Sequence, residues 1–181
     1  MKYKVIYADP PWQYNKGKAH KRGRGAELHY PTMSEKELME MNVADIADEN
    51  CVLFMWVTGP MISSACKVIE AWGFTFKTLA FTWVKSCKTK EGFVWGGGQY
   101  TRANSELVFL ATKGRPKRVS ASVHQVVCEP RREHSRKPDA VRDRIVQLMG
   151  DVPRIEMFAR QQTEGWDTFG NETSKFNVGA K

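Results

Sequence analysis

The sequence predicts an α/β fold in which helices cover a mainly parallel sheet. Residues 51–57 (CVLFMWV) form an uninterrupted apolar run of strand length, which is typical of a strand buried on both faces. Residues 61–72 carry apolar side chains at helical spacing and end before Gly73, and residues 74–85 form a second β-rich run. Strand, helix and strand in this order predict a βαβ unit with two parallel strands.

The first strand is predicted at residues 4–8 (KVIYA), and it ends at Asp9-Pro10-Pro11 because proline has no amide hydrogen for a strand ladder. The amino group of a nucleobase is a weak nucleophile, since its lone pair is delocalised into the ring. The Asp9 carboxylate and the Pro10 carbonyl could accept its two hydrogens, and Trp12 could stack on the base. The alternative is a turn at residues 9–11 with Trp12 as a core aromatic residue.

Two loops are predicted beside this corner. Residues 13–30 show neither helical nor strand periodicity and carry five cations that we expect to bind phosphate groups, namely Lys16, Lys18, Lys21, Arg22 and Arg24. The alternative is a merely solvated surface. Residues 86–102 contain a glycine triplet without the strand-to-helix context of a nucleotide-binding motif. With Lys85 and Arg102 at its ends, this loop is expected to form a flexible wall of a substrate cleft.

The other elements follow from capping and periodicity. Ser34 and Glu37 have the spacing of a capping box and predict a short helix. A helix is predicted from Pro138-Asp139 to Met149, with an inner face of Val141, Ile145 and Leu148. Strands are predicted at residues 106–111, 154–159 and 166–169, with a weaker one at 119–127. We expect one domain over residues 1–172 and a polar tail over residues 173–181.

Composition favours a basic intracellular protein with an anionic partner. The net charge is +8 over 181 residues, and aromatic residues interleaved with Lys and Arg favour nucleic acid over a lipid surface. The four cysteines are far apart and form no C-x-x-C pair, so we expect free thiols in the cytoplasm and no metal site. We expect no signal peptide and no membrane span, because the sequence has no apolar run of about 20 residues.

Several separated motifs resemble one family. They are ADPPW at 8–12, YPTMS at 30–34, LFMWVTG at 53–59, TWVK at 82–85, E-x6-KG at 106–114, HSRKPD at 134–139, IEMFAR at 155–160 and GWDTFGNE at 165–172. In this order they resemble the adenine-N6 methyltransferases related to the catalytic subunit of the eukaryotic messenger-RNA adenosine methyltransferase. The resemblance extends over residues 3–172.

The resemblance implies a Rossmann-like, S-adenosylmethionine-dependent methyltransferase with a circularly permuted motif order. By matching positions, it implies that Asp9, Pro10, Pro11 and Trp12 are catalytic and that Tyr30 lies on a substrate loop. It implies a donor site that includes Asp9, Lys137, Arg160, Asn171 and Glu172. Lys137 suits the donor carboxylate, and its place before a helix N-terminus also favours negative charge. The alternatives are a surface lysine and, at Gly170-Asn171, a simple turn.

The sequence also departs from the family. Gln162-Thr163 stand where relatives often have His-Asn, and the segment from there to Trp166 is shorter. We expect neither the upstream strand of some larger relatives nor a zinc finger or added recognition domain.

The resulting prediction is methyl transfer to the N6 amino group of adenine in a polynucleotide. DNA is favoured over RNA because the compact, basic form resembles bacterial or bacteriophage members, and this also places the protein in the cytoplasm of a bacterium or an infected host cell. RNA remains the alternative substrate. A non-catalytic nucleic-acid-binding subunit and a small-molecule methyltransferase are alternatives of other classes.

Overall fold

A mixed sheet forms the centre of the molecule. The computed structural model describes residues 1–14, 31–98, 100–133, 136–170 and 173. In this part of the chain the sheet has seven strands in the order β5-β3-β4-β2-β1-β6-β7. Their bounds are β1 Tyr3–Ala8, β2 Ala47–Val57, β3 Thr75–Ser86, β4 Glu106–Lys113, β5 Val126–Pro130, β6 Arg154–Met157 and β7 Asp167–Phe169.

The strand directions confirm the predicted α/β class. β1 pairs in parallel with both β2 and β6, and the β3–β5 and β6–β7 pairs are also parallel. β4 is antiparallel to its neighbours β2 and β3. This single reversal brings the first residue of β4 to the edge at which the parallel strands end.

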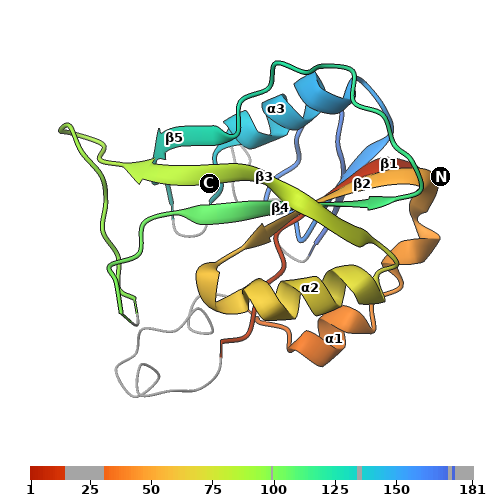
Figure 1. Ribbon diagram of the computed structural model, residues 1–181, viewed down its shortest axis with the longest axis horizontal. Coiled ribbons are helices and arrows are strands. Elements are labelled where there is room, and N and C mark those ends of the chain that lie inside the picture. Colours follow the sequence, from red (N-terminus) through yellow and green to blue (C-terminus); the bar gives the residue numbers. More distant parts are fainter. Residues whose placement is uncertain (15–30, 99, 134–135, 171–172, 174–181) are drawn as a thin grey trace.

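Helices cover both faces of the sheet (Figure 1). Helix α1 (Glu35–Met39) and helix α2 (Ile62–Ala71) lie on one face, and helix α3 (Asp139–Met149) lies on the other. Two short 3-10 helices, η3 (Val43–Asp45) and η4 (Gly59–Met61), precede β2 and α2. The predicted capping box is confirmed, since the Ser34 hydroxyl accepts the Glu37 amide and the Glu37 carboxylate accepts the Ser34 amide.

The alternation of side chains along the central strands builds two cores. Ile6 and Ala8 of β1 face the side of α1 and α2, whereas Val5 and Tyr7 face the side of α3. β2 alternates in the same way over its buried stretch, which explains why residues 51–57 read as a continuous apolar run.

Two sequence-based expectations are corrected by the structure. The weak strand expected at residues 119–127 begins only at Val126, because the Val119 amide bonds to the Leu148 carbonyl and Ser120 and Ser122 form a local turn. The inner face of α3 includes Arg142 and Met149, while Leu148 is only half-buried. Arg142 can be buried because Glu156 pairs with it.

Of the polar tail expected at residues 173–181, residues 174–181 lie outside the described residues. The cysteines at 51, 66, 87 and 128 are all described and all free. Among the described residues, the helices are too short and too polar to span a membrane.

Candidate active site

The site lies where β1 ends. Ala8 pairs with Met55 of β2 on one side and with Met157 of β6 on the other, so Asp9 follows at the point where the chain order of the sheet reverses. Ligands of open α/β sheets bind outside the carboxyl ends of strands at such a switch point. A cavity of about 730 Å³ opens there, and its lining includes Asp9, Pro10 and Trp12. This volume suits a small organic ligand.

Short hydrogen bonds hold the turn after β1, which we name the Asp9 corner (residues 9–12). The Trp12 amide donates to the Pro10 carbonyl at 2.8 Å, and the Met33 amide donates to the Pro11 carbonyl at 2.8 Å. The proline rings fix two φ angles in addition. The Pro10 carbonyl keeps a second lone pair for another donor, because a carbonyl oxygen has two.

Trp12 is a core residue whose edge reaches the cavity. Its side chain is 4% exposed, and its indole donates to the Trp56 carbonyl at 3.1 Å. Trp12 is therefore a core aromatic residue, as in the alternative interpretation of the sequence. Any contact with a base is restricted to the part of the ring that lines the cavity.

A chain of alternating charges crosses the cavity wall. The Lys137 ammonium lies 3.0 Å from Asp9 Oδ2 and 3.2 Å from Glu106 Oε2. The other oxygen of Glu106 lies 2.7 Å from the Lys85 ammonium. The two ammonium groups also lie over indole rings, Lys137 over Trp56 at 5.3 Å and Lys85 over Trp83 at 5.0 Å.

This arrangement shifts the protonation equilibria of the buried groups. Burial alone would raise the pKa of the Glu106 carboxyl, but Lys137 and Lys85 outweigh it and lower that pKa to about 2. Burial likewise opposes the charge on Lys137, and the carboxylates of Asp9 and Glu106 raise the pKa of its ammonium above the ordinary value. Glu106 and Lys137 therefore both stay charged at neutral pH.

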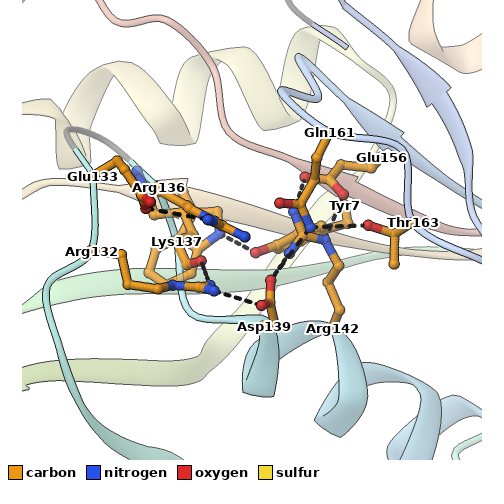
Figure 2. A network of polar contacts seen from close by, with 11 residues as sticks. Tyr7, Arg132, Glu133, Arg136, Lys137, Asp139, Arg142, Glu156, Gln161 and Thr163 are labelled. Carbon is orange, nitrogen blue, oxygen red and sulfur yellow. Dashed lines mark hydrogen bonds and ion pairs between the residues drawn. The ribbon is translucent and has the colours of Figure 1, made fainter. Parts of the chain in front are cut away.

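The segment before α3 holds Lys137 in place. Arg132 donates to the Lys137 carbonyl at 2.6 Å and to the Asp139 carboxylate at 2.7 Å, which ties the segment to the first turn of α3 (Figure 2). Arg142, one turn further along the helix, bonds to the other oxygen of Asp139 at 2.9 Å.

A buried ion pair lies behind this wall. Arg142 donates from Nε and Nη2 to both carboxylate oxygens of Glu156, each at 2.6 Å (Figure 2). The guanidinium also lies 5.7 Å from the Tyr7 ring on β1. Burial raises the pKa of Glu156, and the Arg142 guanidinium opposes this shift. The pair joins α3 to β6, and both of its residues line a small cavity together with Asp9 and Lys137.

A second cavity of about 270 Å³ adjoins Asp9. Pro11, Met33, Phe158 and Phe169 give it a largely apolar lining, and Arg160 lines both this cavity and the larger one. Asp9 therefore stands between two spaces, one polar and lined by cations and one more apolar. Two adjoining cavities can hold two reactants side by side, which transfer of a group between two substrates requires.

Comparison with known proteins decides the family. The family model described as MT-A70 matches residues 3–172. The chain belongs to the MT-A70 family. This membership confirms the predicted Rossmann-like methyltransferase class.

Three relatives of this MT-A70 chain show the range of similarity. It is 38% identical to the Type II methyltransferase M.MunI of Mycoplasma sp over 188 residues, which cover 94% of this chain and 78% of that protein. It is 28% identical to the Arabidopsis thaliana N(6)-adenosine-methyltransferase MT-A70-like, over 93% of this chain and 23% of the relative. It is 27% identical to the human N(6)-adenosine-methyltransferase catalytic subunit METTL3, over 94% of this chain and 28% of the relative. The chain thus spans about a quarter of the length of these plant and animal relatives.

The structure of this MT-A70 family member brings most of the described candidate residues together. Asp9, Pro10, Trp12, Lys85, Lys137 and Arg160 line the larger cavity, and Pro11 lines the smaller one. Arg102 is not on either lining and instead donates to the Trp95 carbonyl at 3.3 Å. The candidates outside the described residues are Lys16, Lys18, Lys21, Arg22, Arg24, Tyr30, Asn171 and Glu172.

Sequence reasoning missed the central carboxylate. Glu106 is predicted as the start of a strand and as the first residue of the E-x6-KG motif, but not as a site residue, yet it links Lys137 to Lys85. The signal in the sequence was its place in the E-x6-KG motif, because the direction of β4 relative to its neighbours is known only from the structure. Arg131, Arg132 and Arg136 also line the cavity, although none of them is among the candidate site residues predicted from the sequence. Groups of His, Cys, Asp and Glu suited to a metal are absent from the described residues.

Proposed function

We propose that this chain transfers a methyl group from S-adenosylmethionine to the N6 amino group of adenine in DNA. The observation that carries the proposal is the position of Asp9 between two adjoining cavities, next to a backbone carbonyl held by two prolines. A carboxylate and a fixed carbonyl form a pair of acceptors for the two hydrogens of an exocyclic amine.

The acceptor pair addresses the chemical difficulty of this substrate. The N6 lone pair is delocalised into the ring, and hydrogen bonds from N6 to Asp9 and to the Pro10 carbonyl localise it on the nitrogen. These acceptors need little reorganisation during the reaction, because the corner is rigid. S-adenosylmethionine supplies a methyl group on a positively charged sulfur. A new N–C bond replaces the C–S bond, and the amine proton leaves to water after the transfer, so a strong base is not required.

The donor is assigned to the space around Lys137 and Arg160. The Lys137 ammonium can bind the donor carboxylate while it keeps Glu106 as a partner, since an ammonium group has three donors. Arg160 borders the apolar cavity, which suits the flat adenine of the donor. Asn171 and Glu172, which match ribose-binding positions of the family, lie outside the described residues.

DNA is the proposed polymer. The Mycoplasma relative, a type II methyltransferase, is matched over most of its length and supports DNA. The N(6)-adenosine-methyltransferases of plants and animals are matched over about a quarter of theirs and support RNA as the second candidate. The net charge of +8 suits either polymer. We also propose that residues 1–172 act as one catalytic domain in the cytoplasm.

The test is transfer of label from S-adenosylmethionine to DNA and to RNA, each single- and double-stranded, followed by nucleoside analysis. We expect N6-methyladenine in DNA. Asp9→Asn should lower kcat about 100-fold or more, while Asp143→Asn, a matched change on the exposed side of α3, should leave it unaltered. Normal turnover in Asp9→Asn with intact donor binding would contradict the proposed role of the Asp9 corner.

Donor binding separates the enzyme from a non-catalytic subunit. A ligand at 100 times its Kd stabilises the folded protein by about 2.7 kcal/mol. We expect a rise in Tm with S-adenosylmethionine. Absence of such a shift would favour the non-catalytic subunit.

A further inference from the structure

An ordered arm connects β3 to β4, where the sequence predicts a flexible wall. Its described residues are 87–98 and 100–104, and we name it the aromatic arm. Figure 1 shows it projecting beyond the end of β3 before it returns to β4. Ser86 and Phe93 form an antiparallel bridge, the Val94 amide donates to the Lys85 carbonyl at 2.9 Å, and the Cys87 amide donates to the Gly92 carbonyl at 3.0 Å. The first part of the arm is therefore a small hairpin.

Asn104 fixes the root of the aromatic arm. Its side-chain amide donates to the Lys85 carbonyl at 2.8 Å and to the Val94 carbonyl at 2.6 Å, and its oxygen accepts the Lys85 amide at 2.9 Å. Gly96 donates to the Ala103 carbonyl at 2.7 Å further out. One side chain thus satisfies three backbone groups and holds the two limbs of the arm together.

This backbone points two large rings away from the cavity. Val94 lines the cavity, whereas its neighbours Phe93 and Trp95 are not part of that lining, as expected for alternate residues of the extended segment that is bridged to Ser86. Phe93 is 48% exposed and Trp95 is 54% exposed. Their ring centroids are 6.4 Å apart with the planes at 76°. A rigidly mounted pair of exposed aromatic rings is typical of a contact surface.

The charges of the arm indicate what covers this surface. Lys88 and Lys90 line the cavity on the same arm, and Arg102 lies on the returning limb against the Trp95 carbonyl. Exposed rings on an arm that also carries cations suit stacked bases flanked by phosphates. A second copy of this chain would bring a net charge of +8 against the same cations.

We propose that Phe93 and Trp95 form a wedge that enters the base stack of duplex DNA next to the target adenine. This inference rests on the proposed function. An amino group inside a duplex cannot reach Asp9 unless the nucleotide leaves the stack. Apolar side chains inserted at a base step unstack it and occupy the space that is opened. Lys88 and Lys90 bind the phosphates on the cavity side, so the extruded base enters the cavity past Val94.

The test compares duplex with denatured DNA. Wild-type protein and the variants Trp95→Ala and Phe93→Ala are assayed for label transfer to unmethylated plasmid DNA before and after heat denaturation. Phe76→Ala is the control, since Phe76 is also partly exposed but lies at the opposite end of β3. Tm with and without S-adenosylmethionine is measured for each protein.

We expect Trp95→Ala to lower kcat/KM on duplex DNA about 10- to 100-fold, in line with the loss of one aromatic stacking contact. On denatured DNA the kcat/KM of Trp95→Ala should stay within about twofold of the wild-type value, and the rise in its Tm with S-adenosylmethionine should persist. Phe93→Ala should show the same selectivity to a smaller extent, and Phe76→Ala should show none.

Four results would overturn the wedge. Equal losses on both forms of DNA would assign the rings a structural role or, if the variant also changes from dimer to monomer in size-exclusion chromatography, a protein interface. Unchanged duplex activity in Trp95→Ala would exclude insertion. If the wild-type protein modifies only denatured DNA, no side chain has to open a base step, and this result would exclude the wedge. If wild type labels neither form, the proposed function fails first, and the wedge fails with it.

Discussion

The ammonium of Lys137 lies 3.0 Å from the carboxylate of Asp9, so a residue two positions before α3 is bonded directly to the residue that follows β1. Residues 128 positions apart in the chain thereby form one wall of the cavity. The same ammonium bonds to Glu106, so Lys137 keeps two carboxylates from repelling each other in a confined space.

Replacement of Lys137 tests this wall. Lys137→Met leaves Asp9 and Glu106 without the cation between them, and breaking a buried ion pair costs about 3–5 kcal/mol of stability. We expect the free energy of unfolding in urea to fall by about 3 kcal/mol and donor binding to weaken markedly. Lys117→Met, at an exposed lysine, is the control. Equal stability of the two variants would show that Lys137 is dispensable for the wall.

Acid titration tests Glu106. Its pKa in the folded protein is about 2, below the ordinary 4.5, so the unfolded chain binds more protons between these values. The stability from this carboxylate is present above about pH 4.5 and is lost as the pH falls toward 2. We expect wild type to be more stable than Glu106→Gln at neutral pH and the difference to shrink across this window. A difference that does not vary with pH would refute the shift.

A double-mutant cycle tests the buried pair of Arg142 and Glu156. Each single variant, Arg142→Met and Glu156→Leu, leaves one charged group without its two-bond partner in the interior. We expect each single variant to lower the free energy of unfolding by about 3–5 kcal/mol. The double variant should lower it by clearly less than the sum of these two losses, because neither charge remains. Urea denaturation of the four proteins measures the coupling. Simple additivity would mean that the two residues act independently.

Thiol labelling tests the core around β2. Burial is the main cause that raises the pKa of Cys51 to about 12, and reagents attack the thiolate. At pH 8 we expect a thiol reagent to modify the exposed Cys128 quickly and Cys51 only after unfolding. Cys128→Ser should therefore remove the fastest phase, and Cys51→Ser should leave the native trace unchanged. Rapid modification of Cys51 in the folded protein would contradict the packing described for β2.

Local chemistry predicted much of the fold. β1 ends at Ala8 because two prolines follow Asp9, and α1 begins at Glu35 because Ser34 and Glu37 satisfy each other's amide groups. β5 was placed too early because alternation alone does not show that the Val119 amide bonds to the end of α3.

The sequence by itself determined the α/β class, the order of most elements and the Asp9 corner, because proline geometry, capping and side-chain periodicity act within a few residues. Only the tertiary structure decided which charges meet. Glu106 reaches Lys137 because β4 runs against its neighbours, and Arg142 is buried because Glu156 of β6 lies opposite α3. Such pairings depend on strand direction and helix placement, which arise from packing between distant segments.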